Sequence, residues 1–248
     1  VGRRQNILSD ENISEIVELL NTDDKNSRLV SIEEVAENEY VLNPSRYLQR
    51  ETVVKNGVFF ETVIKNITRG AQIKASVLDE IVSDEPTNMQ YLMLANLQDG
   101  IISDELPYLK GIDSKYEKYC IKNGSLVISK NASPVKMAIA SVQEGNKILA
   151  NGNLYVIELD KDKINPYFLK AYLESESGKA ALSRVAVGAT LLNLPVEGLK
   201  KVIIPLPDLE SQKKIADQYY AKLSEIKELK YKLEKATEEL EHIYTEEK

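Results

Sequence analysis

The sequence predicts an α+β protein whose centre is a curled, mainly antiparallel sheet with a few helices. Between residues 57 and 204, short apolar runs rich in β-branched and aromatic residues alternate with turn residues. From Leu209 to Lys248 the chain has neither glycine nor proline, and its apolar residues recur every three or four positions. We therefore divide the chain into a small helical segment (1–50), a central domain (51–207) and a long C-terminal helix (208–248).

The composition excludes several classes of protein. A chain of 248 residues with 43% hydrophobic content can bury a substantial core. Its net charge of −7 excludes a uniformly basic coat for nucleic acid, but not a local basic face. A single cysteine and a single histidine exclude a disulfide framework and a Cys/His zinc site. No apolar run reaches the length of a membrane span, so we expect a cytoplasmic protein with no membrane partner.

The first 50 residues carry two short helical patterns. One begins after Ser9, which can cap it, and has an apolar face made of Ile13, Ile16, Val17 and Leu20. The other begins after Ser31, whose spacing to Glu34 is that of a capping box. Such a segment buries little by itself, so we expect it to pack against something else. Because the chain begins at Val1 rather than Met, we also expect it to be a fragment of a longer protein.

The central domain is predicted to be a succession of short strands. An Asp99-Gly100 turn between apolar runs predicts one hairpin, and Asn123-Gly124 predicts a second. A helix is expected to start at Pro166, with Asn165 as its cap and Gly178 interrupting it. The expected strands are 57–60, 63–67, 91–97, 101–102, 119–121, 125–129, 137–142, 154–159 and 202–204.

The C-terminal segment is predicted to be one coiled-coil-type helix capped by Asp208. Its apolar stripe has heptad spacing and consists of Ile226, Leu229, Leu233, Leu240 and Ile243. About 35–40 helical residues make a rod of roughly 55 Å. A rod of that length is too long to bury the whole stripe against its own domain. We interpret it as a spacer or pairing arm, and the alternative is a core helix of the same domain.

The sequence shows no catalytic constellation. It has no Gly-rich phosphate-binding loop. His242 lies within the expected C-terminal helix, and Cys120 lies in an apolar run typical of a packing residue. The segment from Asn165 to Phe168 is faintly similar to the Asn-Pro-Pro-Tyr motif of adenine methyltransferases, but it lacks the second proline and is explained by a helix start. We therefore expect no enzyme activity from this chain itself, and no metal site.

Residues 57–248 resemble one half of a specificity subunit of type I restriction–modification systems, which is a target recognition domain followed by a long spacer helix. The most specific segment is 204–215, where a proline-rich strand exit leads through a Glu/Gln position and an isoleucine into that helix. Weaker motifs follow in the family's order at 68–70, 96–102, 123–129, 164–169 and 188–194. Ser125 stands where the family often has aspartate, a change that still allows the turn.

Residues 1–50 resemble a different protein, the C-terminal tail of the modification (methyltransferase) subunit. The matching segments are 2–6, the helical pattern through Leu20, and 31–47. The two resemblances together imply a fused parent protein, an adenine-N6 DNA methyltransferase with its recognition domain last. They imply no cofactor in this chain, with S-adenosylmethionine held by the upstream domain. The implied partners are double-stranded DNA and the methyltransferase domain or subunit, with or without a restriction subunit.

The resemblance also implies DNA contacts in loops, and three loops have suitable chemistry. Lysine and arginine can contact phosphates, while amide and hydroxyl side chains can contact base edges. Seven lysines between residues 106 and 156 suggest a local basic face, although a scatter of solvated lysines is the alternative. Each loop can equally be an ordinary polar loop. The candidates are Arg69, Gln72 and Lys74; Lys130, Asn131, Ser133 and Lys136; Thr190 and Asn193; and, more weakly, Asn151 and Asn153.

A half-subunit contacts only one half of a split target, so we expect two copies to join. The resemblance favours antiparallel pairing of the C-terminal helices in a two-fold homodimer that contacts an inverted repeat. Alternatively, the segment from Ile13 to Val35 folds back and covers the stripe within one chain. A separate functional hypothesis is a protein-interaction module that acts through the heptad helix without binding DNA, which the acidic balance favours.

Overall fold

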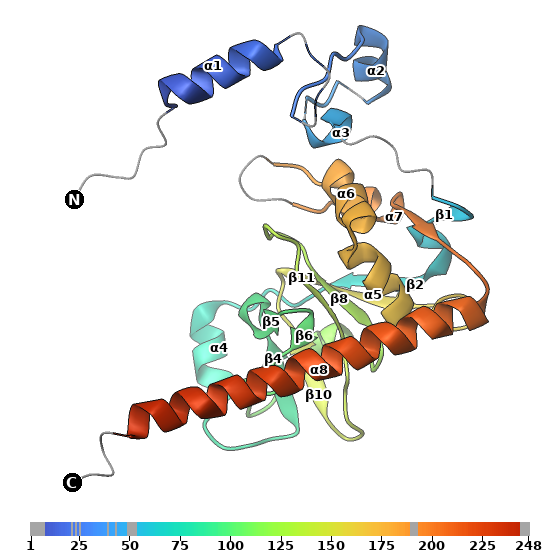
Figure 1. Ribbon diagram of the computed structural model, residues 1–248. Helices are drawn as coiled ribbons and strands as arrows, with labels where there is room; N and C mark the ends of the chain where they lie inside the picture. Colours follow the sequence, from blue (N-terminus) through green and yellow to red (C-terminus); the bar gives the residue numbers. More distant parts are fainter. Residues whose placement is uncertain are drawn as a thin grey trace.

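The computed structural model describes residues 8–20, 22, 24, 26–38, 40–42, 44–48, 54–188 and 193–243. The chain is an α+β protein with two four-stranded sheets and a long C-terminal helix that crosses the domain (Figure 1). This confirms the predicted fold class. The helices are α1 (Asp10–Leu19), α2 (Ile32–Glu37), α3 (Ser45–Leu48), α4 (Ala75–Ile81), α5 (Pro166–Glu174), α6 (Glu176–Val185), α7 (Val196–Lys200) and α8 (Leu209–His242). The strands are β1 (Gly57–Phe59), β2 (Ile64–Arg69), β3 (Val82–Ser83), β4 (Met89–Leu92), β5 (Leu97–Gln98), β6 (Ile101–Ile102), β7 (Tyr108–Leu109), β8 (Leu126–Ser129), β9 (Met137–Ile139), β10 (Lys147–Ala150), β11 (Leu154–Leu159) and β12 (Ile203–Pro205).

The first sheet has the strand order β2-β11-β8-β9 and is antiparallel throughout. Both of its faces are buried. Tyr155 and Ile157 of β11 belong to one hydrophobic cluster, while Leu154 and Val156 belong to the cluster on the opposite face. Because successive side chains of a strand point to opposite faces, a strand buried on both sides is apolar at nearly every position. This explains the continuous apolar run from 154 to 157.

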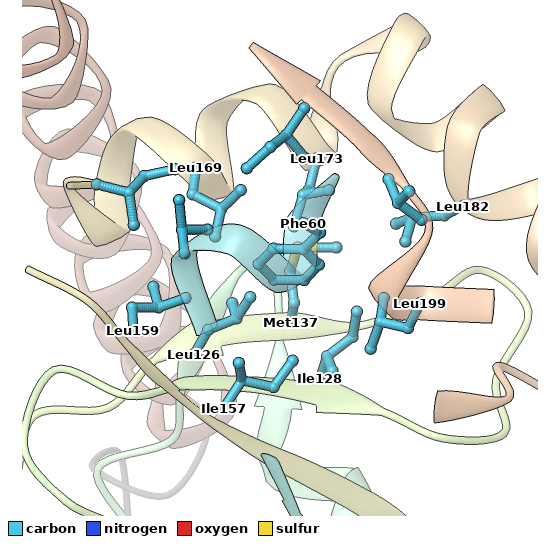
Figure 2. Close-up of a cluster of buried hydrophobic side chains, with 14 of the residues drawn as sticks. Phe60, Leu126, Ile128, Met137, Ile157, Leu159, Leu169, Leu173, Leu182 and Leu199 are labelled. Atoms are coloured by element: carbon cyan, nitrogen blue, oxygen red, sulfur yellow. The ribbon is translucent and has the colours of Figure 1, made fainter. Parts of the chain in front are cut away.

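The larger cluster lies between this sheet and helices α5 to α8 (Figure 2). Phe60, on the 3₁₀ turn η1 (Phe60–Val63), is fully buried at its centre. Leu126 and Ile157 approach it from the sheet, and Leu169 and Leu173 approach it from α5 (Figure 2). Truncating a buried phenylalanine to alanine typically costs about 3–5 kcal/mol, so this ring is a principal anchor of the helices on the sheet.

The second sheet, β10-β4-β7-β3, packs against the opposite face of the first. Ile148 and Ala150 of β10 face the first sheet, whereas Leu149 faces outward to a third cluster. That cluster is covered by α4 and by the 3₁₀ turn η3 (Ser114–Tyr119). The sequence predicted one curled sheet, and the structure has two facing each other. Between β10 and β4 the pairing is parallel, while the other ladders between the strands named above are antiparallel.

The two predicted hairpins had different outcomes. Strands β5 and β6 pair around Asp99 and Gly100, both at positive φ, which confirms the first. The run predicted from Tyr91 stops earlier than expected, because β4 ends at Leu92 and a 3₁₀ turn, η2 (Leu94–Asn96), follows. The second hairpin was wrong. The predicted strand 119–121 begins at the end of η3 and forms only an isolated bridge, between Cys120 and Leu149. Strand β8 pairs instead with β9 and β11.

The helix start at Asn165 is confirmed, since its side chain accepts the Tyr167 and Phe168 amides with Pro166 at the first helical position. The interruption lies at Ser175 rather than Gly178. Ser175 ends α5 and caps α6 by accepting the Gly178 amide. A side chain at Gly178 would place a Cβ only 2.0 Å from the Tyr172 carbonyl oxygen, so this glycine lets two helices pack at a sharp corner.

The N-terminal segment forms α1, α2 and α3, and α3 contacts α6. Arg28 forms an ion pair with Glu34 and donates to the Tyr47 carbonyl oxygen, and the buried Tyr47 donates its hydroxyl to Val41. The apolar side chains of α1 remain exposed. Only the α3 end of this segment therefore packs as predicted within the described residues.

Helix α8 is buried only at its beginning. Gln212 is fully buried, donates to the Lys163 and Pro207 carbonyl oxygens, and accepts the Asn165 amide at 2.8 Å. This single side chain ties the start of α8 to the start of α5. Further along, Leu229 and Leu233 are 57% and 68% exposed. The expectation that the rod leaves its stripe uncovered by its own domain is confirmed.

Candidate nucleic-acid interface

The loops that the sequence singled out converge on one edge of the first sheet. In this antiparallel sheet, the C-terminal ends of β2 and β8 lie beside the N-terminal ends of β11 and β9. The loops attached to these four strand ends therefore lie together along one edge of the sheet, the edge formed by strand ends. We define the loop edge as residues 69–74, 130–136, 151–153, 187–188 and 193. Thr190, which the sequence also suggested, lies outside the described residues.

The segment 69–74 is held against 150–153 by hydrogen bonds to backbone carbonyl oxygens. The Arg69 Nε donates to the Gly152 carbonyl oxygen at 2.8 Å, and the Ala71 amide donates to Ala150. A Cβ at Gly70 would lie 2.2 Å from the Asn151 carbonyl oxygen, so this close approach requires glycine. Gln72 and Lys74 follow with exposed side chains.

Asn151 has a structural role that its sequence context did not reveal. Its amide nitrogen donates to the Tyr91 hydroxyl at 2.6 Å, and its oxygen accepts the Asn153 amide at 2.9 Å. The Tyr91 side chain is buried, and burial raises the pKa of its hydroxyl. Asn151 therefore shapes the turn between β10 and β11 and satisfies a buried hydroxyl, while Asn153 is exposed.

The segment 130–136 is joined to both of its neighbours. The Lys130 amide donates to the Asn153 carbonyl oxygen at 2.8 Å, and the Lys130 carbonyl oxygen accepts the Leu194 amide at 2.9 Å. Asn131 and Asn193 form a β-bridge. The Lys136 amide donates to the Ser129 hydroxyl, while Ser133 is exposed beside the cis Pro134. The structure thus brings together every described candidate from the sequence.

The charge of the loop edge differs from that of the whole chain. It contains Arg69, Lys74, Lys130 and Lys136 and no carboxylate. None of these four side chains has a carboxylate partner among the described residues. At the opposite edge of the same sheet, Lys122 pairs with Glu158 and Lys65 with Asp160. The seven lysines of 106–156 therefore form no single face, because some are neutralised far from the loops.

The described residues hold no cluster of three or more histidine, cysteine or carboxylate side chains able to bind a metal ion. They also include no helix that is both long and apolar enough to span a membrane. Cys120 is half-buried, and burial raises the pKa of its thiol. His242 lies in the last turn of α8.

The sequence did not indicate a buried polar cluster where α5 meets α8. Lys170, Glu174 and Tyr219 hydrogen-bond to one another there. Tyr219 lies within the helix that the sequence predicted, but nothing in the sequence indicated a fully buried lysine on the facing helix.

Comparisons with known proteins agree with this architecture. A family model for the type I restriction modification DNA specificity domain matches residues 79–239, and one for N-6 DNA methylase matches residues 1–56. No curated protein matches the chain. A solved structure concerning assembly and conformational transition of the type I R-M system is 18% identical, with a TM-score of 0.53, over 85% of this chain and 49% of that one.

Two further solved structures are more distant in shape. The HsdS subunit from Thermoanaerobacter tengcongensis is 18% identical with a TM-score of 0.47, over 88% of this chain and 49% of that one. The S subunit from M. genitalium is 14% identical with a TM-score of 0.44, over 68% of this chain and 39% of that one. This chain spans less than half the length of each of the three.

The specificity-domain match extends over more than half of the chain and includes the second sheet, strands β8, β9 and β11 of the first sheet, and most of α8. Specificity domains are non-catalytic, and the methylase match is confined to a short N-terminal piece. The chain belongs to the type I restriction–modification DNA specificity domain family.

Proposed function

We propose that this chain recognises a duplex DNA sequence through its loop edge, as the specificity half of a type I-like adenine-N6 methyltransferase. The observation that carries the proposal is the loop edge itself, where four positive side chains without carboxylate partners adjoin exposed or half-exposed amides. Phosphate contacts from lysine and arginine supply affinity, and amide contacts to base edges supply specificity. Membership of the specificity-domain family supports the same conclusion.

The proposed partners follow from the two ends of the chain. Residues 1–50 would belong to a methyltransferase whose upstream domain holds S-adenosylmethionine, which the N-6 DNA methylase match supports. Residues 51–207 would contact DNA, and 208–248 would form the spacer. A restriction subunit is a further partner of the assembly, and the site of action is the cytoplasm. The net charge of −7 makes the isolated chain a weak DNA binder, with the methyltransferase completing a positive clamp.

A homodimer through α8 completes the proposal. The exposed stripe of Ile226, Leu229, Leu233, Leu240 and Ile243 supports it, because a monomer leaves these side chains in water. The same stripe favours the second candidate function, a protein-interaction module that does not bind DNA.

Binding of the chain to a fluorescent duplex at a series of salt concentrations separates the two functions. For a DNA-recognition module, the logarithm of the binding constant must fall linearly with the logarithm of the salt concentration, because each phosphate contact releases a counterion. We expect measurable binding at low salt with such a slope. An absence of duplex binding at low salt, in a chain that still self-associates, would support the interaction module instead.

A further inference from the structure

A charged cluster joins α8 to the domain, in a groove that residues 134–136 of the loop edge also line. Lys170 of α5 has a side chain with no exposed surface, which is rare for lysine unless it is paired. Its ammonium group donates to the Glu174 carboxylate at 2.8 Å and to the Tyr219 hydroxyl at 2.6 Å. Tyr219, on α8, donates in turn to the other oxygen of Glu174. The three groups close a ring of hydrogen bonds between the two helices.

The tip of the β5–β6 hairpin packs against this cluster, in addition to α5 and α8. Gly100, at a φ of +78°, lies so close that a Cβ there would be 2.6 Å from the Lys170 nitrogen and 3.2 Å from the Glu174 carboxylate. Only glycine satisfies both the backbone angle and the space. The hairpin turn thus covers the ammonium group that links α5 to α8.

The hairpin turn and the segment that follows β6 pair with α8 further along the helix. Asp104 accepts from Lys227 at 2.7 Å, and Asp99 pairs with Lys230. Beyond Lys230, the ion pairs of α8 within the described chain stay inside the helix, as with Lys235 and Glu238. The hairpin is therefore the last part of the domain to which α8 is tied by charge.

An ion pair with a fully buried lysine is an inefficient means of stabilising a helix contact. Removing the Lys170 ammonium group from water is costly, and apolar side chains of similar size often stabilise such a contact as well or better. Burial lowers the pKa of Lys170, and burial together with the Glu174 carboxylate raises the pKa of Tyr219. What the hydrogen bonds add is direction, because they depend on angle whereas apolar contact does not.

We propose that the bracket formed by Lys170, Glu174, Tyr219 and the hairpin 99–104 fixes the direction in which α8 leaves the recognition domain. These are positioning residues. If the chain recognises DNA as proposed above, the bracket also sets the half-site spacing that a dimer accepts. From Tyr219 to Ile243 the helix is about 36 Å long. A swing of ten degrees at the cluster would move its end by about 6 Å, close to two base-pair steps of roughly 3.4 Å.

A distance measurement on the full chain tests the bracket without DNA. Spin labels at Glu144→Cys and Glu241→Cys, in a Cys120→Ser background and diluted with unlabelled chain, report the direction of α8. The first variant replaces the cluster with apolar groups (Lys170→Met, Glu174→Leu, Tyr219→Phe), and the second is Lys227→Ala with Lys230→Ala. The matched control, Lys232→Ala with Lys235→Ala, removes two lysines whose ion pairs are internal to α8.

We expect one narrow distance distribution for wild type and control. Both the apolar cluster variant and the lysine pair variant (Lys227→Ala with Lys230→Ala) should give distance distributions roughly twice as wide as that of wild type. The apolar cluster variant should keep the unfolding temperature of wild type. Distance distributions of equal width in all four proteins would show that the bracket does not fix the direction of α8. If the apolar cluster variant fails to fold, the distance distribution of the lysine pair variant tests the bracket by itself. Its two lysines are exposed, so removing their ion pairs costs little stability.

Selection from a duplex library with a randomised centre separates this inference from the proposed function. Wild type should enrich a split inverted repeat with one spacing, and the bracket variants should enrich the same half-sites with several spacings. One unchanged spacing in the variants would overturn the link between bracket and spacing. If wild type enriches no sequence, both the proposed function and the role of the bracket in spacing are contradicted. The spin-label distances still test whether the bracket fixes the direction of α8, because they do not depend on DNA.

Discussion

At the scale of single residues, the loop edge contains two kinds of polar side chain. Asn151 uses its amide to hold Tyr91 and the Asn153 backbone, and Arg69 uses its Nε to hold Gly152. Gln72 and Asn131 have no side-chain hydrogen bond to any described residue. The first kind builds the edge, and the second kind is available to a ligand.

Two lysines of the loop edge should contribute affinity without sequence preference. We expect Lys130→Ala with Lys136→Ala to weaken duplex binding to similar degrees on target and random DNA. The slope of log affinity against log salt should fall by about one for each phosphate that is no longer neutralised. Lys122→Ala with Lys147→Ala is the matched control, because these lysines are paired with Glu158 and Glu117. Binding unchanged at low salt in the first variant would remove this surface from the interface.

Gln72 and Asn131 should instead contribute specificity. Replacing either with alanine removes a pair of hydrogen bonds to a base edge, which should cost about 1–3 kcal/mol on the target sequence with little change on random DNA. Competition binding between the two DNAs measures this difference. Asn151→Ala is the contrasting control, since it leaves the Tyr91 hydroxyl buried without its donor and should lower the free energy of unfolding by about 1–3 kcal/mol. Equal reductions in affinity on both DNAs for Gln72→Ala and Asn131→Ala would assign these residues to positioning.

At the scale of elements, Gly178 is the critical position of the α5–α6 corner. Its replacement by alanine puts a Cβ 2.0 Å from the Tyr172 carbonyl oxygen and 2.5 Å from the Leu173 Cα, both backbone atoms that cannot move alone. We expect Gly178→Ala to destabilise the fold by about 1–3 kcal/mol, measured by thermal unfolding. Gly111→Ala is the control, because nothing lies within 4 Å of that Cβ position. Similar unfolding temperatures for both variants would show that the corner can relax.

Elements with local signals were predictable from the sequence, and those specified by distant contacts were not. Asn165-Pro166, Asp99-Gly100 and Asp208 carry their own cap and turn chemistry, and each was placed correctly. Strand β10 was missed, and the Asn123-Gly124 hairpin was wrong, because strand partners depend on tertiary packing rather than on the turn alone.

The candidate site was predictable as chemistry but not as geometry. The resemblance to specificity subunits implied contacts in loops, and lysine and amide residues singled out three of them. The antiparallel strand order then placed these loops at one edge. Nothing in the sequence distinguished Asn151, which supports the edge, from Asn153, which is exposed on it. That difference arises from Tyr91, which is 60 residues away in sequence.

At the scale of the whole molecule, the exposed stripe of α8 should make a dimer. We expect wild type to be a dimer at micromolar concentration by light scattering and Leu229→Glu with Leu233→Glu to be a monomer, because charges replace buried apolar contacts. Ile13→Glu with Ile16→Glu tests the alternative that α1 covers the stripe, and should leave the dimer intact. A monomeric wild type would contradict dimerisation of this chain. If Leu229→Glu with Leu233→Glu is still a dimer, the interface lies outside the stripe.

DNA recognition through the loop edge is tested most directly by photocrosslinking to duplex DNA from the two edges of the first sheet. A photoreactive side chain at Gln72 or Ser133 lies on the loop edge, and one at Asn123 or Lys161 lies at the opposite edge of the same sheet. We predict DNA adducts at Gln72 and Ser133 that disappear as salt rises, and none at Asn123 or Lys161. Adducts at Asn123 and Lys161, with none at Gln72 and Ser133, would contradict recognition through the loop edge.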